Sequence, residues 1–165
     1  MENNKSITDI LDKVLRLIGW HQQKSQLVVK NHKPPFFKEG EIWWCYLGEN
    51  IGTEIIGKGS KFMRTVIIYK KLSAYTFLGI PTSTKIKEGQ WYVNFTHRNT
   101  NMDAVLSQLV TLDYRRLDKS IGRLDQKKFD DIATGFANLY NKNPKIDQDK
   151  SPKRIGGRET ISNTL

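Results

Sequence analysis

The sequence contains few of the residues on which disulfide-bonded, metal-dependent and membrane proteins rely. Its single cysteine, Cys45, cannot form a disulfide within the chain, which fits a reducing, cytoplasmic compartment. No run of 18 apolar residues is present, so no membrane span is predicted. The first residues lack the cationic and apolar regions of a secretory signal. We find no metal-ligand spacing, phosphate-binding glycine–lysine motif or nucleophile elbow, so no metal and no other cofactor is expected.

Acidic residues are scarce relative to basic ones. The 165 residues include 27 Lys and Arg against 17 Asp and Glu, which gives a formal net charge of +10. The excess is spread along the chain rather than carried by one tail. It favours an acidic partner such as nucleic acid or an acidic protein, although a merely soluble basic protein would have the same composition.

The N-terminal segment has the pattern of an amphipathic helix. Apolar residues recur at helical spacing over residues 6–18, and Ser6 with Asp9 resembles a capping box. Gly19 is expected to end this helix in a left-handed conformation. Its apolar face must be buried, either against the rest of the domain or against another subunit.

The middle of the chain has the short periods of β-strands. Strands are expected at 41–47, 65–69, 75–80, 91–96 and 104–112, with a short edge strand at 121–124. The first of these is apolar on both faces, so it should be buried on both sides. Lys-Glu-Gly at 87–89 predicts a hairpin turn. The fold class is therefore mainly β with flanking helices, built around a small, strongly bent antiparallel barrel.

The C-terminal part divides into a helix and a polar tail. Asp125 is a good N-cap, and Leu124 with Phe129 forms a hydrophobic staple at the start of the second helix. We therefore expect three regions, which are an N-terminal helical extension at 1–36, a barrel domain at 37–140 and a disordered basic tail at 141–165.

Several spaced motifs resemble those of one family. They lie at 43–54 (strand, Leu-Gly, then Gly-Thr-Glu), 57–68 (glycine-rich loop, Arg-Thr, aliphatic run), 80–83 (Pro-Thr-Ser), 106–117 (Ser-Gln-Leu-Val to Arg-Leu) and 121–124 (Ile-Gly-Arg-Leu). In this order they resemble the PemK/MazF family of toxin endoribonucleases over about residues 37–140. The N-terminal helix and the tail fall outside the resemblance.

The resemblance implies a fold, an activity and partners. Family members have a small SH3-like barrel, form homodimers, cleave single-stranded RNA without a metal and are blocked by a cognate antitoxin. It also implies a catalytic pair at Arg64 and Thr82, with Glu54 as a further catalytic acid. Arginine suits this role because a guanidinium binds two phosphate oxygens at once. Considered without the motifs, Arg64 and Thr82 would be assigned ordinary structural roles, whereas a structural and a catalytic role would weigh about equally for Glu54.

This sequence departs from the family pattern in three places. Thr65 replaces the proline that follows the catalytic arginine, and Val110 replaces an arginine of the Gln-Ile-Arg motif. The loop between Gly57 and Arg64 is extended by residues 60–63. These departures bear on the substrate preference and the activity of the chain.

Other residues are candidates for holding RNA. Lysines around the motifs would line its path, and an aromatic residue that faces outward would stack a base. The predicted contacts are Lys58, Lys61, Ser83, Thr84, Lys85, Lys87 and Gln108, with Trp43, Trp44 or Tyr46 for stacking.

Two alternatives to an RNA-cleaving toxin remain open at this stage. The same barrel occurs in the gyrase-binding toxin CcdB, which the retained Arg–Thr pair argues against. A catalytically silent RNA-binding barrel is the other, and Thr65 with Val110 motivates it.

Overall fold

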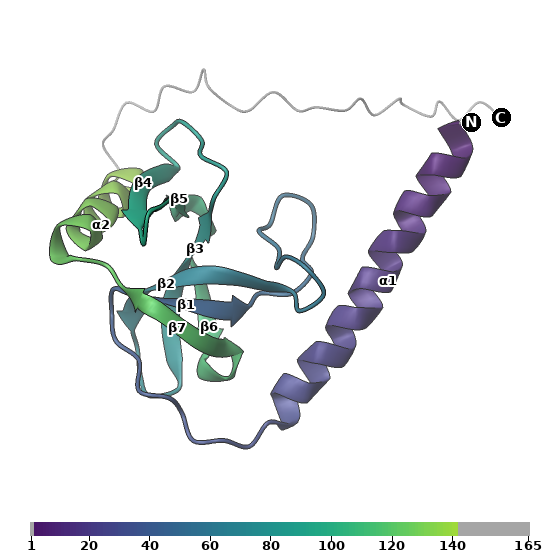
Figure 1. Cartoon of the computed structure of the whole chain (residues 1–165), viewed down its shortest axis with the longest axis horizontal. Coiled ribbons are helices and arrows are strands. Elements are labelled where there is room, and N and C mark those ends of the chain that lie inside the picture. Colours follow the sequence, from purple (N-terminus) through teal and green to yellow (C-terminus); the bar gives the residue numbers. More distant parts are fainter. Residues whose placement is uncertain (1, 142–165) are drawn as a thin grey trace.

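The strands Glu41–Tyr46 and Met63–Lys71 send alternate side chains into two different cores. They belong to a curled antiparallel sheet with a helix at each end (Figure 1). The computed structural model describes residues 2–141, with side chains from residue 7 onward. In chain order the elements are α1 (Glu2–Val29), β1 (Glu41–Tyr46), β2 (Met63–Lys71), β3 (Thr76–Ser83), β4 (Tyr92–His97), β5 (Thr100–Val105), the 3₁₀ turn η1 (Leu106–Gln108), β6 (Val110–Asp113), the 3₁₀ turn η2 (Tyr114–Arg116), β7 (Leu117–Arg123) and α2 (Gln126–Tyr140). The predicted fold class, a small antiparallel barrel-like sheet with N- and C-terminal helices, is confirmed.

Strand β3 is the centre of the sheet. The strand order is β4-β5-β3-β2-β1-β7, and β6 also pairs with β3. One edge of β3 pairs with β2, while its other edge pairs with β6 over Thr76–Gly79 and with β5 over Thr82–Ser83. Sharing one edge between two strands lets the sheet curl, so few strand edges stay open.

The two cores lie on opposite faces of the sheet. The core inside the curl contains Trp43 and Cys45 from β1 together with Val66 and Ile68 from β2. The other core lies under α2 and takes the intervening residues of the same strands, Ile42 and Ile67, together with Ile132 of the helix. The prediction that the first strand is buried on both sides is confirmed for this half of β1.

Two strand predictions are wrong. The segment 104–112 is not one strand, because η1 turns Leu106 into the α2 core and divides the segment between β5 and β6. The turn at 87–89 is not a hairpin, because β4 pairs with β5 and not with β3. The tight hairpin instead joins β4 to β5 at Arg98 and Asn99, which both have positive φ. The predicted edge strand at 121–124 is the end of the longer β7.

Helix α1 does not end at Gly19, as the sequence predicts, but continues to Val29. Trp20 and Leu27 are buried against Phe62, and this packing outweighs the cost of one glycine inside a helix, about 1 kcal/mol. Gly19 has a packing role instead, since a Cβ there would lie 3.3 Å from the Phe62 ring.

The two faces of α1 have different surroundings. One face holds Arg16, Trp20 and Leu27 against the sheet domain. The apolar stripe on the opposite face is exposed, and each of its members is at least 46% accessible: Ile7, Ile10, Leu11, Val14, Leu17 and Ile18. Within the described residues the stripe does not pack against the rest of the domain. Its burial against another subunit stays a prediction.

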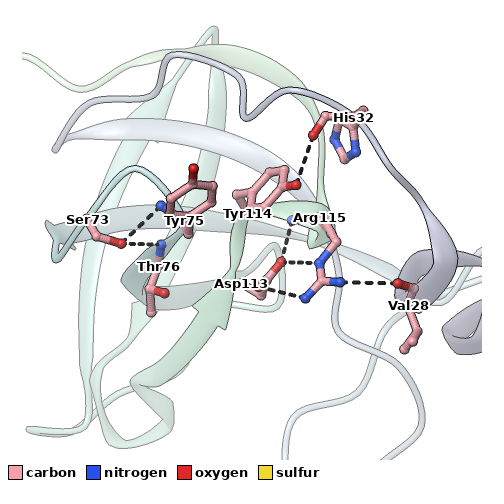
Figure 2. Close-up of polar contacts among 8 residues, drawn as sticks. All are labelled: Val28, His32, Ser73, Tyr75, Thr76, Asp113, Tyr114 and Arg115. Atoms are coloured by element: carbon pink, nitrogen blue, oxygen red, sulfur yellow. Dashed lines mark hydrogen bonds and ion pairs between the residues drawn. The ribbon is translucent and has the colours of Figure 1, made fainter.

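The C-terminal end of α1 and the segment that follows it are tied to η2 (Figure 2). Arg115 pairs with Asp113 at 2.8 Å and donates to the carbonyl of Val28, while the Tyr114 hydroxyl donates to the carbonyl of His32. Hydrogen bonds from Arg115 lower the pKa of Asp113 below its usual value. These contacts fix where α1 leaves the domain.

Helix α2 begins as predicted. Asp125 is its N-cap and accepts a hydrogen bond from the Lys128 amide. The predicted tail lies almost entirely outside the described residues. Among the helices within residues 2–141, none is both long and apolar enough to cross a membrane.

Candidate functional site

Helix α2 covers one part of a sheet face, and a row of side chains crosses four strands on the uncovered part of the same face. In the β1–β2 register Trp44 lies opposite Thr65. The Thr65 and Thr82 hydroxyls form a hydrogen bond, and Thr82 Oγ1 also donates to the Thr65 carbonyl at 3.2 Å. Beyond Trp44, β7 contributes Asp118. The row therefore reads Asp118, Trp44, Thr65, Thr82 from one strand to the next.

Arg64 lies beside this row and is held by two carbonyl groups. Its Nε donates to the Ile56 carbonyl at 2.8 Å, and its Nη1 donates to the Thr82 carbonyl at 3.2 Å. Partial burial lowers the pKa of Arg64, but an arginine side chain remains charged in proteins. The guanidinium is therefore a fixed positive charge next to the Thr82 residue.

The loop that leads into β2 is shaped by glycine and by α1. Gly57 admits no side chain, since a Cβ would lie 1.8 Å from the Phe62 carbonyl oxygen. Arg16 of α1 pairs with Glu49 at 2.8 Å and also donates to the Gly57 carbonyl at 3.4 Å. Helix α1 thus fixes the loop that carries Lys58 and Lys61 and leads to Arg64 at the start of β2.

Two adjoining cavities open around Arg64 and Lys58, which line both. The first, called here the Thr82 cavity, has a volume of about 620 Å³ and is lined by Trp44, Lys58, Gly59, Ser60, Lys61, Met63, Arg64, Thr65, Thr82, Thr84 and Asp118. The second, the Lys87 cavity, has about 300 Å³ and includes Ser83, Lys85, Lys87, Tyr92 and Gln108. Five lining residues are cations and one, Asp118, is an acid, so the combined surface suits a polyanion.

Most residues predicted to bind RNA line one of these cavities. Lys61 and Thr84 line the first, Ser83, Lys85, Lys87 and Gln108 line the second, and Lys58 lines both. Of the three aromatic candidates, Trp44 faces outward and is 40% exposed, whereas Trp43 is buried in the core. Tyr46 packs beside Trp20 of α1.

Glu54 is not brought together with Arg64 and Thr82. Its Oε2 accepts the Ile51 amide within the same loop, and it lines a separate cavity with Gln108. Gln108 accepts the Ile55 amide and so supports the loop backbone. Within residues 7–141, Glu54 forms no ion pair with Arg64, so its base role stays a prediction from the resemblance.

Sequence reasoning missed three residues of the site. Tyr92 lies under the Lys87 ammonium, 5.3 Å from ring centroid to Nζ. Asp118 and the Thr65 hydroxyl reach the site only through strand pairing. No local signal marks Asp118, whereas Thr65 is marked as a departure from the family pattern. Within residues 7–141, no group of three His, Cys, Asp or Glu is placed to hold a metal ion.

Comparison with known proteins decides the family. The model of the PemK-like, MazF-like toxins of type II toxin-antitoxin systems matches residues 38–140, well over half of the chain. The chain belongs to this family. Among curated proteins, no sequence matches it.

Solved structures show the same fold at low identity. An endoribonuclease from a mycobacterial species, solved in complex with its cognate antitoxin, is 15% identical, with a TM-score of 0.52 over 66% of this chain and 100% of that one. MazF from Deinococcus radiodurans is 12% identical, with a TM-score of 0.52 over 64% of this chain and 96% of that one. At these identities the likeness establishes the fold of this PemK/MazF-like toxin and not its substrate.

Proposed function

We propose that this family member is a metal-independent endoribonuclease toxin that cleaves single-stranded RNA. One observation carries the proposal, namely that Arg64 and Thr82 line the same cavity with a contact of 3.2 Å between them. The two residues are 18 positions apart in the sequence, and β2–β3 pairing brings them together. Separate locations for these residues would have removed the basis for catalysis.

The proposed reaction uses the ribose 2′-OH as the nucleophile. The 2′-OH passes its proton to a water molecule and the 2′-oxygen attacks the adjacent phosphorus. The bond to the 5′-oxygen breaks, and this oxygen takes a proton from water, so the products are a 2′,3′-cyclic phosphate and a 5′-OH end. Arg64 stabilises the charge that develops on the phosphate oxygens, because its guanidinium is fixed before substrate binds. The Thr82 hydroxyl, which donates to the Thr65 carbonyl in the structure, turns its proton to one of these oxygens when RNA binds.

The lysines extend this phosphate site along the strand. Lys61 lines the Thr82 cavity, Lys85 and Lys87 line the Lys87 cavity, and Lys58 lines both, as Arg64 does. Cations on both sides of the scissile phosphate hold several phosphates of one strand, so binding should weaken steeply as salt rises.

We propose two protein partners from the relatives. The mycobacterial endoribonuclease was solved with its cognate antitoxin, and a cognate antitoxin is proposed here as well. A homodimer is the second proposal, and the exposed stripe on α1 supports contact with another subunit. Light scattering of the full chain measures the second directly, and a monomer at all concentrations would refute it.

Cleavage of a single-stranded RNA in EDTA tests the proposed activity. Arg64→Ala should lower the rate at least 10²-fold, the usual cost of a lost charge-stabilising donor. Arg64→Lys keeps the charge but not the planar pair of donors, so it should recover only part of the rate. Arg98→Ala is the matched control, because it removes an equal charge at the exposed β4–β5 turn.

The fold of each variant must be verified by circular dichroism, since Arg64 also satisfies two carbonyl groups. Intact RNA after incubation with folded wild-type protein refutes the activity. Salt-sensitive RNA binding without any product would instead establish the silent RNA-binding alternative.

A further inference from the structure

Asp118 is an acid in a surface that otherwise suits phosphate. It lines the Thr82 cavity together with Lys58, Lys61 and Arg64. A carboxylate repels phosphate, so its place in a nucleic-acid site must have another reason. Among the described residues, the hydrogen bond to its side chain comes from the Tyr46 hydroxyl, at 3.3 Å to Oδ1. Since each carboxylate oxygen accepts two hydrogen bonds, both oxygens can still accept from a ligand.

Trp44 is the neighbouring residue of the row and is open to the same cavity. It lies on β1 between Trp43 and Cys45, which pair with Ser120 and Leu117 of β7, so Trp44 faces the part of β7 that carries Asp118. Its side chain is 40% exposed although its neighbours are buried. An exposed indole stacks any nucleobase, and stacking of this kind contributes about 1–3 kcal/mol per base.

Trp44 and Asp118 lie about one nucleotide's length from the proposed phosphate site. Trp44 lies on β1 and Thr82 on β3, two strands away, which is roughly 10 Å at the usual strand spacing. A nucleotide whose phosphate contacts Thr82 and Arg64 therefore reaches Trp44 with its own base or the adjacent one.

We propose that Trp44 and Asp118 form a base-recognition subsite that selects guanine next to the scissile phosphate. Trp44 stacks the base, and the Asp118 carboxylate accepts hydrogen bonds from its edge. Guanine presents two N–H donors side by side, at N1 and the 2-amino group, which match the two oxygens of a carboxylate. Uracil presents one N–H between two carbonyl oxygens, which the carboxylate repels. This inference rests on the proposed RNA substrate but not on cleavage.

Binding of RNA that cannot be cut tests the subsite independently of the activity. The probes are 2′-O-methyl hexamers in EDTA, in which the nucleophile is blocked, namely hexauridine and the same hexamer with one guanosine or one inosine. Inosine differs from guanosine only by the missing 2-amino group. The wild-type protein should bind the guanosine hexamer about 5-fold or more tightly than either of the others, as one good base contact provides.

Two substitutions with matched controls locate the effect. Asp118→Asn should remove the guanosine preference, whereas Asp131→Asn on the exposed side of α2 makes the same charge change and should leave it intact. Trp44→Ala should weaken binding of all three hexamers, Trp44→Phe should restore it, and Trp91→Ala should have no effect. Trp91 is a suitable control because it is 39% exposed but lines neither cavity.

Each result decides the inference. Equal affinity of the wild-type protein for the three hexamers, or an unchanged preference in folded Asp118→Asn, overturns it. An Asp118→Asn protein that cuts every RNA sequence equally slowly also overturns it, since Asp118 would then act in the chemistry. A guanosine preference in binding without any RNA cleavage leaves the subsite standing and refutes the proposed activity alone.

Discussion

The hydrogen bond between Thr65 and Thr82 allows the sharpest test of the proposed chemistry. Thr82 has two partners in the structure, the Thr65 hydroxyl and the Thr65 carbonyl. If Thr82 donates its proton to a phosphate oxygen, the Thr65 hydroxyl must be the donor in the pair. The proline that the family pattern has at this position cannot fill that role, so the arrangement is a property of this chain.

Thr65→Val removes the hydroxyl and leaves Thr82 with the Thr65 carbonyl as its acceptor. One net buried hydrogen bond is worth about 1 kcal/mol, so the melting temperature should fall by a few degrees. The cleavage rate should fall about 10-fold, because the Thr65 hydroxyl no longer donates to the Thr82 oxygen and the Thr82 hydroxyl becomes a weaker donor to the phosphate. Thr65→Ser keeps the hydroxyl and should retain most of the rate.

The double variant separates positioning from an independent contribution. Thr82→Val alone should cost about 10²–10³ in rate, the typical loss of one donor to the transition state. If Thr65 acts only through Thr82, adding Thr65→Val to Thr82→Val should cause no further loss. The assay is the initial rate of cleavage of a fluorescent single-stranded RNA in EDTA, with melting curves for each variant.

Additivity would refute this reasoning. If the double variant loses a further 10-fold, Thr65 contributes without Thr82. If Thr65→Ser behaves like Thr65→Val, the packing of the side chain matters and not its hydroxyl.

Two further predictions concern the elements that hold the site. Arg16→Ala leaves Glu49, whose side chain is only 16% exposed, without its partner. The loop at 57–62 should then show faster amide exchange, and the free energy of unfolding should fall by about 1–2 kcal/mol. Lys13→Ala, at an exposed position of α1, should cause neither change. Hydrogen bonds from Arg115 lower the pKa of Asp113. The stabilisation from the Asp113 carboxylate should therefore be complete above the ordinary aspartate pKa of about 3.9 and be lost as the pH falls below it. If the melting temperature of Asp113→Asn follows that of the wild type over this pH range, the Asp113–Arg115 pair does not stabilise the fold.

Local signals in the sequence predicted the parts of the fold that local physics controls. The N-cap at Asp125 and the apolar alternation of the early strands need only neighbouring residues, and both are present in the structure. The end of α1 at Gly19 was wrong because distant residues decide it. Trp20 packs over Gly48, where a Cβ would lie 2.2 Å from the indole, and no helix signal in residues 6–19 contains that contact.

The same distinction applies to the site. Arg64 and Thr82 were predicted because family motifs mark them, and β2–β3 pairing brings them together. Asp118 has no motif, and it reaches the site only because β7 pairs with β1 across a long stretch of chain. Thr65 was noticed as a missing proline, but its hydroxyl partner could be found only from the register of two strands.

The position of the site follows from where the two helices stop covering one face of the sheet. Along β1, Ile42 is buried under α2, Tyr46 packs against Trp20 of α1, and only Trp44 between them is open. In Figure 1 helix α2 lies at the left of the sheet and α1 at the right. Trp44 lines the Thr82 cavity, which therefore opens between the parts of β1 that the two helices cover. Strands β2 and β3 follow the same order, with Ile67 and Ile80 in the α2 core. Thr65 and Thr82 take the next position on that face, where they line the Thr82 cavity although both are buried. Because the buried neighbours fix the backbone on the α2 side, the open side chains are presented in a set geometry, as preorganised binding of a phosphate and its base requires.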